Sequence, residues 1–104
     1  MPIEEKKIGK YHCFIIEGNL GHELAYELYE KMNTAITRGD LHLIVDLENC
    51  CFVSSGGLGA IASILMVARS RGGDLKIRKP QTAVLNLFNL TKLDEILEVV
   101  DEIP

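Results

Sequence analysis

The sequence has no surplus of positive charge, because its 15 acidic residues outnumber its 11 lysines and arginines and leave a net charge of −4. Domains that bind nucleic acid are usually basic, so this balance argues against a general nucleic-acid binder. Long apolar runs are also missing. The longest, Leu58 to Ala68, is far short of the roughly 20 residues needed to span a bilayer. We therefore expect neither nucleic acid nor a membrane as a partner.

Cysteine is scarce, and the three present, Cys13, Cys50 and Cys51, form no Cys-x-x-Cys pair. An odd number of cysteines does not make a disulfide framework, so we expect a reducing, cytoplasmic location with the thiols acting as small buried apolar groups. The opening residues, Met1 to Lys7, carry charges where a signal peptide would need an apolar core, which supports the same expectation.

Chemistry-bearing patterns are equally sparse. His12, His22 and His42 stand singly, with no His-x-x-x-His spacing. The Gly-x-Ser-x-Gly elbow of serine hydrolases is missing as well. We therefore expect a protein that is not an enzyme and that has neither a metal site nor a cofactor.

What is present is the composition of an ordinary globular protein, with 47% apolar and 25% charged residues. A chain of 104 residues without internal repeats or linkers predicts one domain over residues 1–104. Strand-like and helix-like patterns alternate along it. The predicted elements are strands 3–8 and 11–17, a helix 22–38, a strand 41–47, a helix from Gly56 or Gly57 to Ser70 or Arg71, a strand 75–78, a helix beginning at Lys79-Pro80, and a strand 96–100.

This order, β-β-α-β-α-β-α-β, predicts an α/β (α+β) fold. We expect a mixed, mainly parallel sheet of four or five strands with helices packed on it. The first two strands are separated by Gly9-Lys10, which predicts an antiparallel hairpin at the opening edge. The continuous apolar run 41–47 is typical of a central strand covered on both faces.

The stretch Phe52 to Ala62 is unusual, because small, polar and flexible residues gather where a helix begins. Such residues contribute little packing, so they point to a functional reason. The helix has a core face formed by Leu58, Ile61, Leu65 and Ala68, and its first three turns carry no charge. A helix that is apolar nearly all round is either deeply buried or covered by a partner. The second face consists of Gly59, Ala60, Ser63, Met66 and Val67.

Residues 57–62 also match a relaxed dinucleotide-binding pattern, Gly-x-Gly-x-x-Ala, and helix N-termini attract phosphates. However, seven residues separate Leu47 from Ser55, so the turn is not tight. The next acid, Asp74, lies beyond the end of the same helix, and no Walker lysine follows. Direct nucleotide binding at residues 55–62 therefore stands as an alternative function.

Two runs, Leu43-Ile-Val-Asp-Leu-Glu48 and Phe52-Val-Ser-Ser-Gly-Gly-Leu-Gly-Ala-Ile61, resemble the signature of STAS domains, in particular of bacterial anti-sigma factor antagonists. The resemblance covers nearly the whole chain. In that family the motif usually reads Asp-Ser-Ser/Thr-Gly-Leu-Gly, and a kinase phosphorylates its first serine. Aligned without gaps, that serine is Ser55, while Ser54 takes the place of the aspartate and Gly56 that of the second hydroxyl.

The resemblance implies a STAS-like fold and a signalling domain that binds an anti-sigma factor with serine kinase activity, which frees a sigma factor. Phosphorylation of Ser55, with Ser54 as the second choice, would end the interaction, and a serine phosphatase would restore it. An alternative is an interaction module of another bacterial regulatory or transporter-associated complex that works without phosphorylation. The predicted partner-binding residues are Asn19, Gly21, Ser54, Ser55, Gly56, Gly57, Gly59, Ala60, Ser63, Met66 and Val67.

The residues themselves are compatible with such a switch. Ser55 is expected at or near the N-cap of its helix, where its hydroxyl could equally act as a structural cap. A phosphate there adds a charge of about −1.5 to −2. The free N–H groups of the helix would tolerate this charge, whereas a partner over the second face would have to desolvate it. Modification is therefore expected to reduce binding and to leave stability unchanged.

Overall fold

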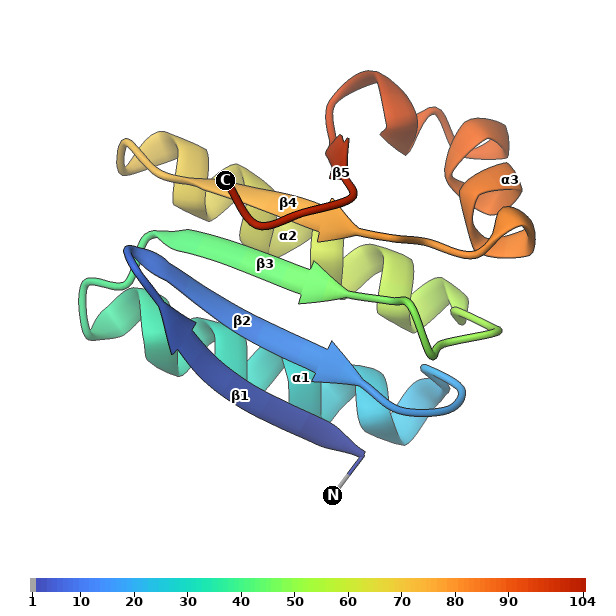
Figure 1. The fold of residues 1–104 in the computed structure, drawn as a ribbon, viewed down its shortest axis with the longest axis horizontal. Coiled ribbons are helices and arrows are strands. Elements are labelled where there is room, and N and C mark those ends of the chain that lie inside the picture. The colour runs from blue at the N-terminus through green and yellow to red at the C-terminus, as the bar shows by residue number, and fades with distance from the viewer. Residues whose placement is uncertain (1) are drawn as a thin grey trace.

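The computed structural model describes residues 2–104, and its elements follow the predicted order (Figure 1). All five strands belong to one sheet, with neighbours in the order β1-β2-β3-β4-β5. The first two strands pair antiparallel and the others run parallel, which confirms a mixed, mainly parallel sheet with an opening hairpin. The strands are β1 (Ile3–Ile8), β2 (Tyr11–Ile16), β3 (His42–Asp46), β4 (Asp74–Arg78) and β5 (Glu98–Val100).

Two long helices, α1 (His22–Thr37) and α2 (Ser55–Ser70), lie side by side against one face of the sheet (Figure 1). The shorter α3 (Thr82–Leu90) follows the carboxyl end of β4. Within residues 2–104, no helix combines the length and the apolar character needed to cross a bilayer. The core between sheet and helices includes the fully buried side chains of Phe14, Leu28, Val45, Ile61 and Leu65.

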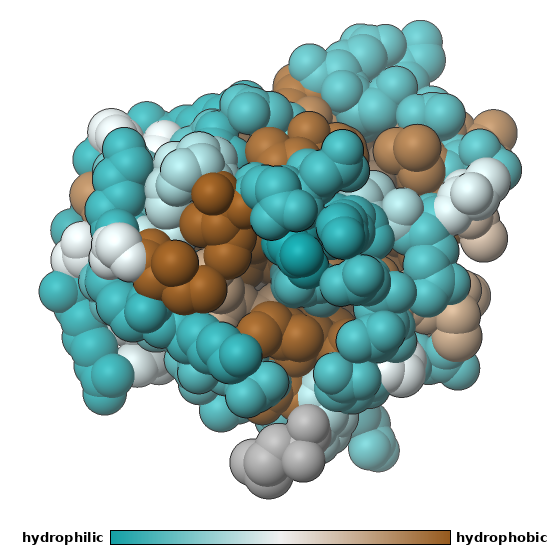
Figure 2. Space-filling model, in the orientation of Figure 1, coloured by the Kyte–Doolittle hydropathy of each residue, from teal (hydrophilic) through white to brown (hydrophobic). Residues whose placement is uncertain are grey.

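Within residues 2–104, no helix lies over the opposite face of the sheet (Figure 1). There the segment after β5 crosses the strands, and Ile103 packs against Tyr11, Cys13 and Ile44. Figure 2 views this face and shows apolar side chains between polar ones. The central strand β3 is buried on both faces, as predicted, but its second cover is this C-terminal segment.

Two boundaries differ most from the sequence prediction, and the other predicted boundaries lie within about one or two residues of the observed ones. The third helix begins at Thr82 and not at Lys79-Pro80, because Lys79 adopts a left-handed conformation with φ +49°. A residue that precedes proline is disfavoured in helical geometry, which keeps Lys79 out of the helix, and the N-cap residue Gln81 is still extended, with φ −66° and ψ 159°. At the other end, the carbonyl of Leu93 accepts hydrogen bonds from the N–H groups of Ile96 and Leu97, so the turn continues and β5 begins only at Glu98.

The three cysteines are free thiols in two different environments. Cys13 and Cys50 are buried, and burial raises the pKa of both thiols, which keeps them protonated. For Cys51 the prediction of a buried thiol is wrong. Its side chain lies exposed in the loop before α2, and its Sγ donates a hydrogen bond to Asn19 Oδ1 at 2.7 Å.

We expect one thiol of the native protein to react rapidly with a water-soluble thiol reagent, since exposure controls thiol reactivity. The two buried thiols should react only on unfolding. A colorimetric thiol count before and after addition of denaturant measures both phases. Cys51→Ser should remove the fast phase without changing the melting temperature, and more than one fast thiol in the native protein would contradict the assignment.

Candidate functional site

Two loops meet at the carboxyl ends of β2 and β3. The Leu20 N–H donates to the Phe52 carbonyl at 2.8 Å, and the Ser54 N–H donates to the Leu20 carbonyl at 2.9 Å. These bonds form a parallel bridge between Leu20 and Val53, whose side chains are both buried. The junction therefore holds the first turn of α1 beside the first turn of α2.

The junction brings together the predicted site residues that are far apart in the sequence. Asn19 is exposed and reaches the second loop through its bond from Cys51. Gly21 is the N-cap residue of α1, and Ser54 is the N-cap residue of α2. Ser55 is exposed at the first position of α2. All four of these residues therefore lie at one end of the helix layer.

The two serines have different roles. Ser54 makes the helix cap: its Oγ accepts a hydrogen bond from the Gly57 N–H at 3.1 Å, and its carbonyl accepts one from the Leu58 N–H at 3.0 Å. The hydroxyl of Ser55 makes no hydrogen bond within residues 2–104. The structural role that the sequence left open for Ser55 thus belongs to its neighbour, and the Ser55 hydroxyl is available to solvent.

This division predicts opposite results for two alanine variants. Ser54→Ala should lower the free energy of unfolding by about 1 kcal/mol, which is typical for the loss of an N-cap. Ser55→Ala should change it by less than about 0.5 kcal/mol, as for most exposed positions. Urea unfolding of both variants measures the difference. Equal losses would mean that the two hydroxyls share the cap.

The residues around Ser55 in the sequence have uncharged side chains, while the backbone N–H groups at the start of α2 carry partial positive charge. No charged residue occurs between Glu48 and Arg69. The N–H groups of Ser55 and Gly56 precede the first intrahelical hydrogen bond and lie at the positive end of the helix dipole. A phosphate on Ser55 would therefore meet favourable backbone groups and no acidic side chain from this helix.

Arg78, the cation at the end of β4, is already engaged in ion pairs. Arg78 Nη1 lies 2.7 Å from Asp46 Oδ2 and 3.2 Å from Glu48 Oε1. The hydrogen bond from Arg78 holds the pKa of Glu48 below its usual range, so this carboxylate stays charged. The Arg78 guanidinium is therefore part of an ion-pair network at the end of β3 and is not a free anion site.

The glycines of the motif serve different purposes. Gly57 is buried, and a methyl group there would lie 2.8 Å from Val53 Cγ1 and 3.0 Å from Leu20 Cδ2. Its small size thus lets α2 pack on the loop junction, and its N–H is used by the cap. Neither the space at Gly57 nor its N–H group is therefore available to bind a nucleotide phosphate. A methyl group at Gly59, by contrast, would meet no atom within 4 Å apart from its chain neighbours and the adjacent backbone of α2.

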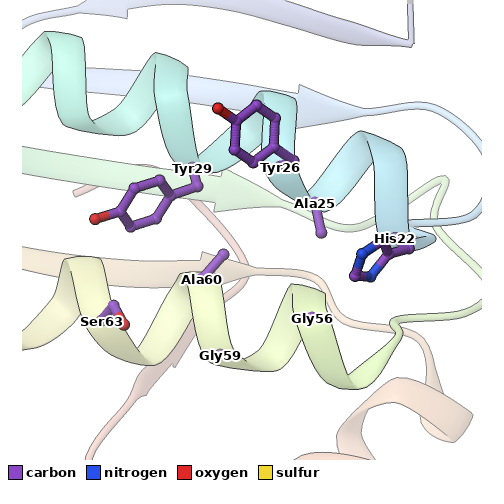
Figure 3. Close-up of a pocket in the computed structure, with 8 residues that line it drawn as sticks. All are labelled: His22, Ala25, Tyr26, Tyr29, Gly56, Gly59, Ala60 and Ser63. Atoms are coloured by element: carbon purple, nitrogen blue, oxygen red, sulfur yellow. The ribbon is translucent and has the colours of Figure 1, made fainter.

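A groove of about 240 Å³ runs between α1 and α2 (Figure 3). Ala25 and Ala60 point into it from opposite sides, and His22 and Tyr29 lie toward its two ends. Sequence reasoning missed the α1 side of this groove. The signal for it was Tyr26, an aromatic residue outside the apolar stripe of α1, which is 69% exposed. The lining residues are His22, Ala25, Tyr26, Tyr29, Gly56, Gly59, Ala60 and Ser63.

The remaining predicted site residues divide into outward and inward positions. Met66 and Val67 are exposed and extend the neutral surface along α2, whereas Ala60 is buried at the base of the groove. Phe52, in the loop before the cap, is half-exposed and was not predicted as part of the surface. The helix layer therefore presents a continuous uncharged region that begins at Phe52 and Ser55 and runs along α2.

Comparison with known proteins agrees with this geometry. A family model described as Mlab, STAS domain, matches residues 15–100. The chain is also 26% identical over 87 residues to an anti-sigma F factor antagonist from Paenibacillus polymyxa, and the match covers 83% of this chain and 74% of that protein.

Solved structures share the fold. A Thermotoga maritima protein, provisionally assigned as an anti-sigma factor antagonist, superposes with a TM-score of 0.91 at 24% identity, covering 97% of this chain and 87% of that one. The anti-sigma factor antagonist SpoIIAA, in its unphosphorylated form, gives 0.79 at 17% identity over 97% and 89%. Phosphorylated Bacillus SpoIIAA gives 0.79 at 19% identity over 96% and 92%. The chain belongs to the STAS domain family, and its similarity to known proteins lies with anti-sigma factor antagonists.

Proposed function

We propose that this protein is an anti-sigma factor antagonist whose binding is switched at Ser55. In its unmodified form it binds an anti-sigma factor that is also a serine kinase, and the sigma factor is freed. The observation that carries the proposal is the position of Ser55. It is exposed at the start of α2, its hydroxyl is not needed for the helix cap, and its own helix carries no charged residue before Arg69.

The chemistry of the switch belongs to the partner. The kinase holds ATP, the Ser55 Oγ attacks the γ-phosphorus, ADP leaves, and the hydroxyl proton passes to a base of the kinase. The product carries a charge of about −1.5 to −2 at the first residue of α2. The helix dipole stabilises that charge in the free protein, while a partner that covers the neutral surface must strip it of water. The modified protein is therefore released.

Ser54 replaces the acid that this family usually carries before the modified serine. An aspartate at an N-cap accepts the same backbone hydrogen bond that Ser54 Oγ accepts from the Gly57 N–H. The substitution thus keeps the local structure and removes one negative charge. We expect the partner of this protein to carry a less basic contact at this point than the partners of acid-bearing relatives.

The fold is compatible with both states of such a switch. SpoIIAA has been solved with and without phosphate, and this chain is equally similar in fold to the two forms. The free N–H groups of Ser55 and Gly56 offer a phosphate the backbone donors that a helix N-terminus supplies. These similarities support a switch in which the modified chain keeps its fold.

The proposal is tested by incubating the protein with ATP, Mg²⁺ and each purified anti-sigma factor kinase of the source organism. Intact mass and peptide mapping should then locate one phosphate on Ser55. Ser55→Ala should abolish the modification, while Ser54→Ala, the matched control, should retain it. A stable complex that acquires no phosphate would favour the interaction module without phosphorylation, and a phosphate on Ser54 would move the switch by one residue.

A further inference from the structure

The geometry points to the groove between α1 and α2 as the seat of an amphipathic helix of the partner protein. That helix would place apolar residues in the groove and lysine or arginine along the flank that meets α1. This inference rests on the proposed function and specifies the recognition element that the partner supplies. It also assigns a binding role to residues of α1, above all Tyr26 and Tyr29.

The base of the groove is formed by small residues, so the backbone of a partner chain can approach it closely. It consists of Gly56, Gly59, Ala60 and Ser63, none with more than two side-chain heavy atoms. A methyl group at Gly59 would have no atom within 4 Å apart from its chain neighbours and the adjacent backbone of α2, so space remains above this residue. Small residues on one helix permit close approach of a second helix, and a bulky residue here would fill the groove.

The walls of the groove carry large side chains that the core does not use. Tyr26 is 69% exposed at the groove, and Met66, which lies outside the groove lining on α2, is 60% exposed. Tyr29 reaches over the groove from α1 (Figure 3) and remains 37% exposed. Tyrosine and methionine are enriched in protein interfaces, and tyrosine is a frequent source of binding energy. Large exposed side chains around a shallow apolar base form a surface that suits a row of apolar side chains on a partner helix.

The length of the groove matches two turns of a helix. Its lining extends from His22 to Tyr29 on α1 and from Gly56 to Ser63 on α2. Seven residues of helix rise about 10.5 Å. A bound helix would therefore contact the groove through side chains at positions i, i+3 or i+4, and i+7, which is how amphipathic helices dock in grooves.

Charge distinguishes the two rims and selects the flank of the bound helix. Glu23 and Glu30 lie three residues before and four residues after Tyr26, so they neighbour it on the surface of α1, and both are exposed. The α2 rim has no charged residue before Arg69. A partner helix with basic residues on the α1 side and apolar residues on the α2 side is complementary to this arrangement.

The position of Ser55 connects this groove to the switch. Ser55 directly precedes Gly56, which lines the groove beside His22, and it lies one helical turn before Gly59. A phosphate on Ser55 would thus stand at the end of the groove on the α2 rim. That rim meets the apolar side of the bound helix, away from its basic flank, so the phosphate would lack a counter-charge there.

The test uses Gly59→Leu, which fills the groove at a position with open space. Affinity for the purified kinase that phosphorylates the wild-type protein should fall by about 10- to 100-fold in titration calorimetry. The melting temperature should not fall, because leucine is a better helix former than glycine. The matched control, Asn86→Leu on an exposed position of α3, should bind like the wild type. Tyr26→Ala should also weaken binding about 10-fold.

A double variant, Glu23→Lys with Glu30→Lys, tests the basic flank and should lower the association rate most strongly at low salt. If Gly59→Leu binds the kinase like the wild type and is still phosphorylated on Ser55, the groove assignment is wrong while the proposed function stands. A dimer of the protein alone that Gly59→Leu dissociates would assign the groove to a second copy instead. Failure of every kinase to bind the wild-type protein would overturn both.

Discussion

Ser55→Asp should weaken the complex with the anti-sigma factor kinase by roughly 30- to 150-fold, while the melting temperature stays constant or rises slightly. An unpaired polar or charged group that is stripped of water at an interface costs about 2–3 kcal/mol, and each 1.4 kcal/mol is tenfold in affinity. The same carboxylate is favourable in the free protein. It faces the positive end of α2, where an acid contributes about 0.3–1 kcal/mol.

Titration calorimetry and thermal unfolding on the same preparations measure the two effects separately. Ser55→Asn is the matched control, because it has nearly the shape of aspartate without the charge, and it should bind within a few-fold of the wild type. Wild-type affinity for Ser55→Asp would mean that the partner leaves this residue in water. A large fall in the melting temperature would mean that Ser55 is structural and that Ser54 is not the sole cap.

The sequence was sufficient to predict the sheet and its helices, because their signals are local and periodic. The apolar stripe of α1 extends along the helix, and the apolar residues Leu43 to Val45 form the centre of β3, so both elements could be predicted from local patterns. The opening hairpin followed from two strand-like runs around a glycine turn. The resemblance of residues 52–61 to the STAS signature pointed to the loop of the candidate site, and the family match covers this stretch.

The separate roles of Ser54 and Ser55, and the part of α1 that lines the groove, could not be predicted in the same way. Which serine caps α2 depends on the exact residue at which the helix begins, and that residue is fixed by the bond of the Ser54 N–H to Leu20, far away in the sequence. The α1 wall of the groove is likewise a tertiary feature. Tyr26 lines the groove only because α1 packs beside α2.

The glycine pair after α2 shows the same limit, and it leads to the largest expected loss of stability. The pattern Gly72-Gly73 predicts the end of the helix without distinguishing the two residues. In the structure they complete a Schellman motif, in which Gly72 N–H bonds to the Arg69 carbonyl at 3.1 Å and Gly73 N–H bonds to the Ala68 carbonyl at 2.8 Å. Gly72 has φ +88°, so it alone needs the left-handed conformation.

Gly73 is required for a different reason. A methyl group there would lie 2.0 Å from the Leu41 carbonyl oxygen, and the next residue, Asp74, donates its N–H to that same oxygen at 2.9 Å. The α1 end has the same motif, with Gly39 and then Asp40, and there the second position tolerates a side chain. The demand for glycine at position 73 therefore comes from the contact with Leu41 and not from the turn.

Gly73→Ala should accordingly lower the free energy of unfolding by about 3 kcal/mol or more, the upper part of the range for overpacking, because the clash is with backbone and no rotamer relieves it. For a domain of this size the melting temperature should fall by more than about 12 °C. Gly72→Ala is the matched control. A methyl group there has open space, so its cost is limited to the left-handed conformation, about 1–2 kcal/mol. Thermal unfolding of the two variants decides between these sources of strain. Equal losses would mean that Leu41, just before β3, moves aside to accept the methyl group. In that case the register between β3 and β4 would be set by residue pairs beyond this contact.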